Sequence, residues 1–175
     1  MKPLLIGQAP GPNTNPEYPL FPAPRTSAGG RLCEIMGLSR GEYLSLFDRC
    51  NLLPYFPGRT QARDDSFPMT PARLAAQVMR PLLRGRQVIV LGRKVADAFE
   101  LPKVDWFEPI QLRCGPRHAA TGCSGLADVI VVPHPSGRNH WYNTELNRAR
   151  ARAALRALIN KSDEPDRNVL PFVQA

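Results

Sequence analysis

Short apolar segments, each followed by a loop rich in glycine, proline or asparagine, are the feature that most restricts the fold of this chain. The clearest is Gln87 to Gly92, and similar segments occupy residues 3–6, 50–53 and 128–132. Continuous apolar runs of this length are typical of strands buried on both faces of a parallel sheet. Another strand candidate lies near residues 107–112.

Helical patterns separate these segments. They begin after residue 30 and at residues 39, 70, 93 and 142, and the last is expected to run to about residue 160. Ser39 and Glu42 have the spacing of a capping box, and Thr70-Pro71 is typical of an N-cap followed by proline at the first helical position. Strands alternating with helices predict an α/β fold: a three-layer α/β/α sandwich with a mostly parallel central sheet. We expect one domain over residues 1–160 and a polar C-terminal tail over residues 161–175.

Composition limits the partners and the location. The chain has a net charge of +8 and a sequence pI of about 9.9, which favours a polyanionic partner such as nucleic acid. No apolar run approaches the roughly 18 residues that a membrane-spanning helix needs, and the N-terminus does not resemble a secretory signal. We therefore expect a cytoplasmic monomer that does not enter membranes.

The four cysteines, at positions 33, 50, 114 and 123, include no C-x-x-C pair. A zinc site, an iron-sulfur cluster or a redox pair normally uses such spacings. The cysteines are therefore interpreted as buried or incidental thiols, and we expect neither a metal nor an organic cofactor.

Polar segments follow three of the predicted strands. They are Gly7 to Pro12, Asn51 with its following loop, and His134 to Asn139. Ligands of open α/β sheets bind beyond the carboxyl ends of the strands, so these three segments are predicted to converge on one cleft.

Two of these segments carry a family resemblance. Gly7-Gln8-Ala9-Pro10-Gly11 and His134-Pro135-Ser136-Gly137-Arg138-Asn139 together resemble the two signature loops of uracil-DNA glycosylases. The resemblance extends over about residues 3–160, because the segment 28–32, the strand ending at residue 51 and the strand 88–92 follow in family order.

The resemblance implies roles for three catalytic residues. A glycosylase extrudes its target base and stabilises the negative charge that develops on it as the glycosidic bond breaks. His134 would donate a hydrogen bond to the departing base, and the carboxamide of Asn51 would bind its Watson-Crick edge. Gln8 would complete this set. As structural alternatives, His134 can be a strand-end histidine held by a backbone partner, Asn51 a turn residue, and Gln8 a residue that satisfies loop backbone groups.

Further residues are implied in binding. Main-chain groups of Gln8 and Ala9 would border the base, and Phe21, with Tyr18 behind it, would form an aromatic platform beneath it. Both rings can equally be loop anchors. Arg138 would wedge into the duplex, or as an alternative contact a phosphate. The expected DNA-binding residues are Pro10, Gly11, Pro12, Ser136, Gly137, Arg138 and Asn139.

One position departs from the family pattern. Some members carry Asp or Asn where this chain has Ala9, and use it to position or activate the attacking water. The first loop looks closer to branches that read Gly-Glu-Ala-Pro-Gly, with Gln8 in place of the glutamate and without their cluster cysteines. The water-handling residue is unassigned, and Asn13, Asn15 and Glu17 are nearby in sequence.

Three functions are compatible with the sequence. The first is a monofunctional DNA glycosylase of the base excision repair type, acting on uracil or another deaminated or modified base flipped out of DNA. The second is a catalytically degenerate DNA-binding protein on the same scaffold, which Ala9 favours and His134 and Asn51 oppose. The third is a hydrolase or transferase of free nucleotides, which would leave the basic surplus without a purpose.

Overall fold

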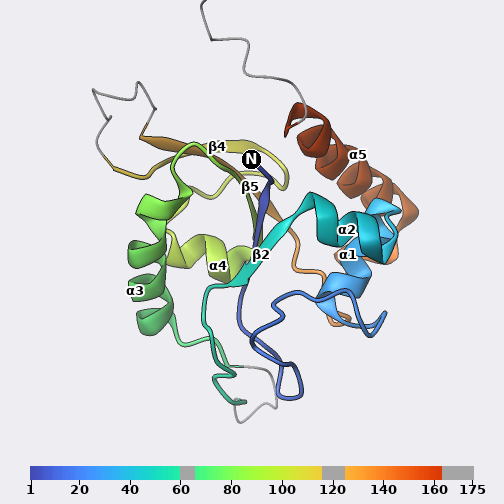
Figure 1. Ribbon diagram of the computed structural model, residues 1–175, viewed down its shortest axis with the longest axis horizontal. Helices are drawn as coiled ribbons and strands as arrows, with labels where there is room; N and C mark the ends of the chain where they lie inside the picture. Colours follow the sequence, from blue (N-terminus) through green and yellow to red (C-terminus); the bar gives the residue numbers. More distant parts are fainter. Residues whose placement is uncertain (60–65, 116–124, 163–175) are drawn as a thin grey trace, which may run out of the picture.

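A five-stranded sheet with helices on both faces forms the protein (Figure 1). The computed structural model describes residues 1–59, 66–115 and 125–162. The strands are β1 (Leu4–Gly7), β2 (Asp48–Asn51), β3 (Gln87–Leu91), β4 (Pro109–Arg113) and β5 (Leu126–Val132). The helices are α1 (Ala28–Met36), α2 (Arg40–Leu46), α3 (Met69–Met79), α4 (Arg93–Ala98) and α5 (Glu145–Ser162), with 3₁₀ helices η1 (Arg80–Leu83) and η2 (His140–Asn143).

The strand order is β2-β1-β3-β5-β4, and all neighbouring strands are parallel except β4, which runs antiparallel to β5 at one edge. Because β1 connects to β2 on one side and lies beside β3 on the other, the chain reverses its direction of winding between β1 and β3. Open α/β sheets bind ligands at such a switch point, beyond the carboxyl ends of the strands. In Figure 1 the loops that follow β1 and β2 lie together at that end of the sheet.

Alternate residues of the strands enter two separate cores. Ile6 and Val90 pack with α3 and α4 on one face, whereas Leu5 and Ile89 pack with α1, α2 and α5 on the other. Each fully buried side chain of this size contributes about 1.5–3 kcal/mol relative to an exposed one. The two cores confirm the predicted three-layer sandwich with a mostly parallel sheet.

The local boundaries differ from the sequence prediction at three places. α3 begins at Met69 after Pro68, so the predicted N-cap at Thr70 is wrong; Pro71 is tolerated because first-turn N–H groups have no helical partner. The second strand ends at Asn51 instead of continuing to residue 53. α5 begins at Glu145, three residues later than predicted, because η2 precedes it. Of the predicted tail, residues 163–175 lie outside the described part.

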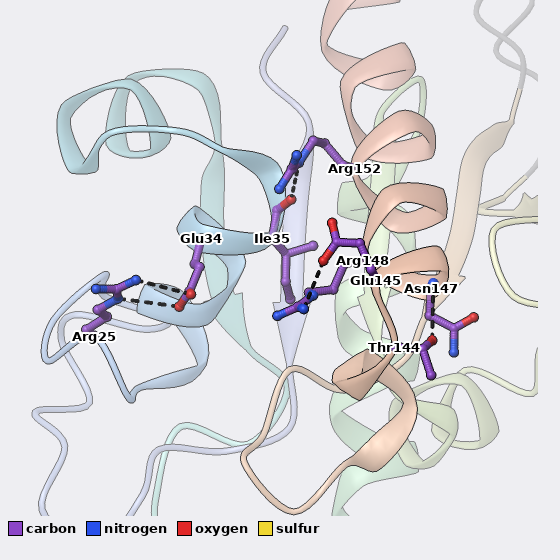
Figure 2. A network of polar contacts seen from close by, with 8 residues as sticks. All are labelled: Arg25, Glu34, Ile35, Thr144, Glu145, Asn147, Arg148 and Arg152. Carbon is purple, nitrogen blue, oxygen red and sulfur yellow. Dashed lines mark hydrogen bonds and ion pairs between the residues drawn. The ribbon is translucent and has the colours of Figure 1, made fainter.

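The basic face of α5 is partly structural. The guanidinium group of Arg152 donates to the carbonyl oxygen of Ile35 (2.9 Å; Figure 2), and that of Arg156 donates to the carbonyl oxygen of Met36 (3.1 Å). Ile35 and Met36 are the last residues of α1. Cations at the carbonyl end of a helix satisfy unpaired acceptors and interact favourably with its dipole. These contacts fix α1 against α5. No helix among the described residues is long and apolar enough to cross a membrane.

Candidate active site

A cavity of about 540 Å³ lies beyond the carboxyl ends of β1, β2 and β5. The loop after β1 supplies most of its lining, between Gln8 and Gly29. Asn51 at the end of β2 and His134 after β5 complete it. The three polar segments predicted from the sequence therefore do meet at one cleft.

The predicted site residues differ in whether they line the cavity. All five of the base-binding set line the cavity, whereas only part of the DNA-binding set does. Pro12, Arg138 and Asn139 do not line the cavity; Pro12 and Arg138 are exposed, and Asn139 is half-buried. The lining candidates are Gln8, Ala9, Pro10, Gly11, Phe21, Asn51, His134, Ser136 and Gly137.

Asn51 lies directly against the end of β1. Gly7 and Asn51 are register partners, and a Cβ atom added to Gly7 would lie only 2.5 Å from the Oδ1 atom of Asn51. After these positions the chains stay paired, because the N–H groups of Leu52 and Leu53 donate to the carbonyl oxygens of Gly7 and Gln8 (both 2.9 Å). The carboxamide of Asn51 is therefore held close to the first loop.

The side chains of Gln8 and His134 both lie close to Gly92. Gly92, which follows β3, has a φ of +90°, a backbone conformation that favours glycine. A Cβ atom there would lie 3.0 Å from the Cβ of His134 and 3.4 Å from the Nε2 of Gln8. Because Gly92 has no side chain, both candidate side chains have room beside it, although Gly92 was not among the predicted site residues.

The loop that carries His134 is anchored at both ends. The carboxamide of Asn139 donates to the carbonyl oxygen of His134 (2.9 Å) and accepts from the N–H of Trp141 (3.0 Å). The buried hydroxyl of Tyr142 donates to the carbonyl oxygen of Pro133 (2.7 Å). Burial raises the pKa of Tyr142 well above its ordinary value, so this donor stays protonated at neutral pH. The partly buried side chain of Asn139 therefore holds the histidine loop in place.

The segment that carries Phe21 is pressed against the start of α1. The hydroxyl of Tyr43 donates to the carbonyl oxygen of Leu20 (3.1 Å), and that of Ser27 to the carbonyl oxygen of Phe21 (2.9 Å). Leu20 has a φ of +52°, a strained value for a leucine that these contacts and its burial hold in place. A Cβ atom at Gly29 would lie 2.0 Å from the Leu20 oxygen, so only glycine permits this approach.

The two candidate platform rings touch one another. Tyr18 and Phe21 pack edge to face with ring centroids 5.9 Å apart, and the guanidinium of Arg40 lies 4.8 Å from the Phe21 centroid. Both rings line the cavity. Phe56 also lines the cavity but was not predicted from the sequence. Its position in the loop after β2 was the only sequence feature that could have indicated it.

The lining is uncharged. Among the described residues that border the cavity, none has a carboxylate, ammonium or guanidinium group. Of the three residues considered for handling water, Asn13 and Asn15 line the cavity and Glu17 does not. The Oδ1 of Asn15 accepts from the N–H of Glu17 (3.0 Å), which leaves Asn13 as the better placed of the two amides.

Among the described residues, no group of three or more His, Cys, Asp or Glu side chains is placed to hold a metal ion. Burial raises the pKa of Cys50 to about 11 and also raises the pKa values of Cys33 and Cys114. These thiols stay protonated at neutral pH, whereas a metal ligand or nucleophile is a thiolate.

The protein is thus an α/β protein with a cavity of amide, hydroxyl, aromatic and imidazole groups at the switch point of its sheet, the usual place of a ligand site in such folds. The chain belongs to the uracil DNA glycosylase superfamily, whose family model matches residues 1–159. No curated protein matched the chain. The family confirms the resemblance seen in the two signature loops. It supports a DNA glycosylase activity in DNA repair, with DNA as the partner.

The contact between Gly7 and Asn51 gives a first prediction. We expect Gly7→Ala to lower the single-turnover rate of base release by about 10²-fold, because the new methyl group displaces the carboxamide by about an ångström. The measurement is a double-mutant cycle with Asn51→Ala. If Gly7 acts through Asn51, adding Gly7→Ala to Asn51→Ala costs no further activity. Full additivity of the two losses would contradict this coupling.

Proposed function

We propose that this protein is a monofunctional DNA glycosylase that hydrolyses the N-glycosidic bond of uracil or another deaminated or modified base flipped out of DNA. The observation that carries the proposal is the convergence of Gln8, Asn51 and His134 on one uncharged cavity. Amide and imidazole groups match the edge of a neutral base, and a cavity of this size encloses a whole extruded nucleoside.

The proposed reaction begins with cleavage of the bond between the sugar C1′ atom and the base nitrogen, whose electron pair leaves with the base. An N–H group of His134 stabilises the negative charge that accumulates on a carbonyl oxygen of the base. Asn51 holds the Watson-Crick edge through one donor and one acceptor. Water then adds to C1′ and releases its proton to solvent.

The absence of an acidic side chain at Ala9 fits a stepwise reaction. If the base departs before water attacks, the sugar cation that remains is reactive enough to need no strong general base. Positioning of the water then suffices, and the Asn13 carboxamide lines the cavity where it can supply this. The proposed enzyme uses no metal or organic cofactor.

The charge distribution opposes the free-nucleotide alternative. Binding a free nucleotide requires cations or a glycine-rich N–H cradle for its phosphates. The described lining contains no ammonium or guanidinium group, while the chain as a whole carries a charge of +8. Phosphates of a polymer, which stay outside the cavity, fit this arrangement better.

The experiment is incubation of the protein with oligonucleotides that carry uracil, hypoxanthine, xanthine or hydroxymethyluracil, followed by alkaline cleavage at abasic sites. We expect strand breaks at the position of at least one of these bases and none in normal DNA. Breaks formed without the alkaline step would contradict a monofunctional enzyme. Tight, salt-sensitive binding with every base left intact would instead support the degenerate DNA-binding protein.

A further inference from the structure

Arg31 lies at the rim of the cavity, beside the loop that follows β5. It belongs to α1, in the turn after Gly29, which lines the cavity. Its guanidinium packs against Gly137: a Cβ atom added there would lie 3.6 Å from Cζ and 3.7 Å from both terminal nitrogens. Gly137 itself borders the cavity, so this cation is held next to the opening without entering the uncharged lining.

Neighbouring arginines on the same side of the sheet are engaged within the protein. Arg25 pairs with Glu34 (3.1 Å) and Arg148 with Glu145 (2.9 Å), while Arg152 binds a carbonyl oxygen of α1 (Figure 2). Arg31 has no such contact among residues 1–59, 66–115 and 125–162. A half-buried guanidinium whose N–H groups have no partner in the described part of the chain is positioned for an external acceptor.

The loop beside Arg31 is rigid enough to fix that acceptor. Asn139 donates its backbone N–H to the carbonyl oxygen of Ser136 (3.1 Å) and closes a turn with Gly137 inside it. Because Gly137 has no side chain, an anion can approach the guanidinium across the turn. The planar fork of arginine binds two oxygens of one phosphate at once.

We propose that Arg31 binds a backbone phosphate that flanks the extruded nucleotide. This inference rests on the proposed function, since it requires DNA to deliver a nucleotide into the cavity. The base would occupy the uncharged interior, and the phosphate next to it would lie at the rim against Arg31 and Gly137. Arg31 would then set the depth to which the nucleotide enters.

The test is binding of DNA that carries a tetrahydrofuran abasic analogue, which requires no catalysis. We expect Arg31→Gln to weaken binding about tenfold and to reduce the slope of log affinity against log salt by about 0.9, the loss of one phosphate contact. Arg25→Gln is the matched control: its side chain is 81% exposed and already paired with Glu34, so we expect a change below about twofold.

A scan with single methylphosphonate linkages identifies the phosphate. If Arg31 contacts one linkage next to the analogue, neutralising that linkage weakens the wild-type protein but weakens Arg31→Gln no further. An equal penalty for both proteins at every linkage, or an Arg31→Gln effect no larger than that of Arg25→Gln, would overturn the proposal. Arg31→Lys keeps the charge and should therefore retain the wild-type slope of log affinity against log salt. If the glutamine variant does not fold, the lysine variant is used to test the phosphate contact.

The two proposals fail in different ways. If the wild-type protein releases no base from any substrate while Arg31→Gln still loses its linkage-specific binding, the catalytic proposal fails and the phosphate contact stands. If the wild-type protein releases base and Arg31→Gln behaves like Arg25→Gln, only the phosphate contact fails.

Discussion

Replacing His134 with alanine is expected to lower the single-turnover rate of base release by about 10²–10³-fold, the cost of removing one donor from a site that stabilises developing charge. The described lining of the cavity contains no ammonium or guanidinium group that could take its place. Binding of abasic DNA should change much less than the rate, since the donor acts mainly in the transition state.

His140→Ala is the matched control for this substitution. His140 is exposed on η2, outside the cavity lining, and its ring contacts the Asn143 side chain (3.1 Å). We expect its rate to stay within about twofold of the wild-type rate, because changes at exposed positions away from a site have small effects. An equal loss in both variants would point to damage to the loop, and a full rate in His134→Ala would remove the histidine from the mechanism.

Gly29→Ala is expected to give the largest loss of stability. Helix propensity alone favours alanine here by about 1 kcal/mol. The added Cβ atom, however, would lie 2.0 Å from the backbone oxygen of Leu20 and 2.7 Å from that of Phe21, neither of which can rotate away. We expect a net loss of about 2–3 kcal/mol and a fall in Tm of roughly 4–12 °C, together with slower base release as Phe21 moves.

Gly41→Ala provides the comparison for that experiment. Gly41 lies in α2, where an added Cβ atom would meet no other atom within 4 Å. The same chemical change should therefore stabilise the protein by about 0.5–1 kcal/mol through backbone entropy and propensity. Thermal and urea unfolding measure both variants. A Gly29→Ala protein as stable as Gly41→Ala would mean that the Leu20 segment is not pressed against α1.

The sheet was predictable because its signal is local. The apolar runs at residues 87–92 and 128–132 mark β3 and β5, and the loops that follow parallel strands meet at one edge by geometry alone. The second strand was placed too late because Leu52 and Leu53 are as buried as strand residues. Their N–H groups bind the first loop, whereas the true strand begins at charged Asp48, which pairs with Arg86.

The supporting contacts of the site were not predictable, since they join residues far apart in the chain. Nothing in the local sequence indicates that Gly92 lies beside His134 or that Arg31 reaches Gly137. The sequence likewise does not indicate that arginines of α5 bind the carbonyl oxygens at the end of α1. Sequence patterns thus predicted candidate residues that line the cavity, while the packing that orients them depends on the folded chain.

The most direct test is a crystal structure of the protein with duplex DNA that carries 2′-fluoro-deoxyuridine, whose glycosidic bond resists cleavage. We predict that the uracil lies outside the helix stack, inside the cavity, with the Asn51 carboxamide on its Watson-Crick edge and the His134 ring within hydrogen-bond reach of a carbonyl oxygen. A uracil still stacked in the duplex, with the cavity facing away from the DNA, would contradict the proposed function.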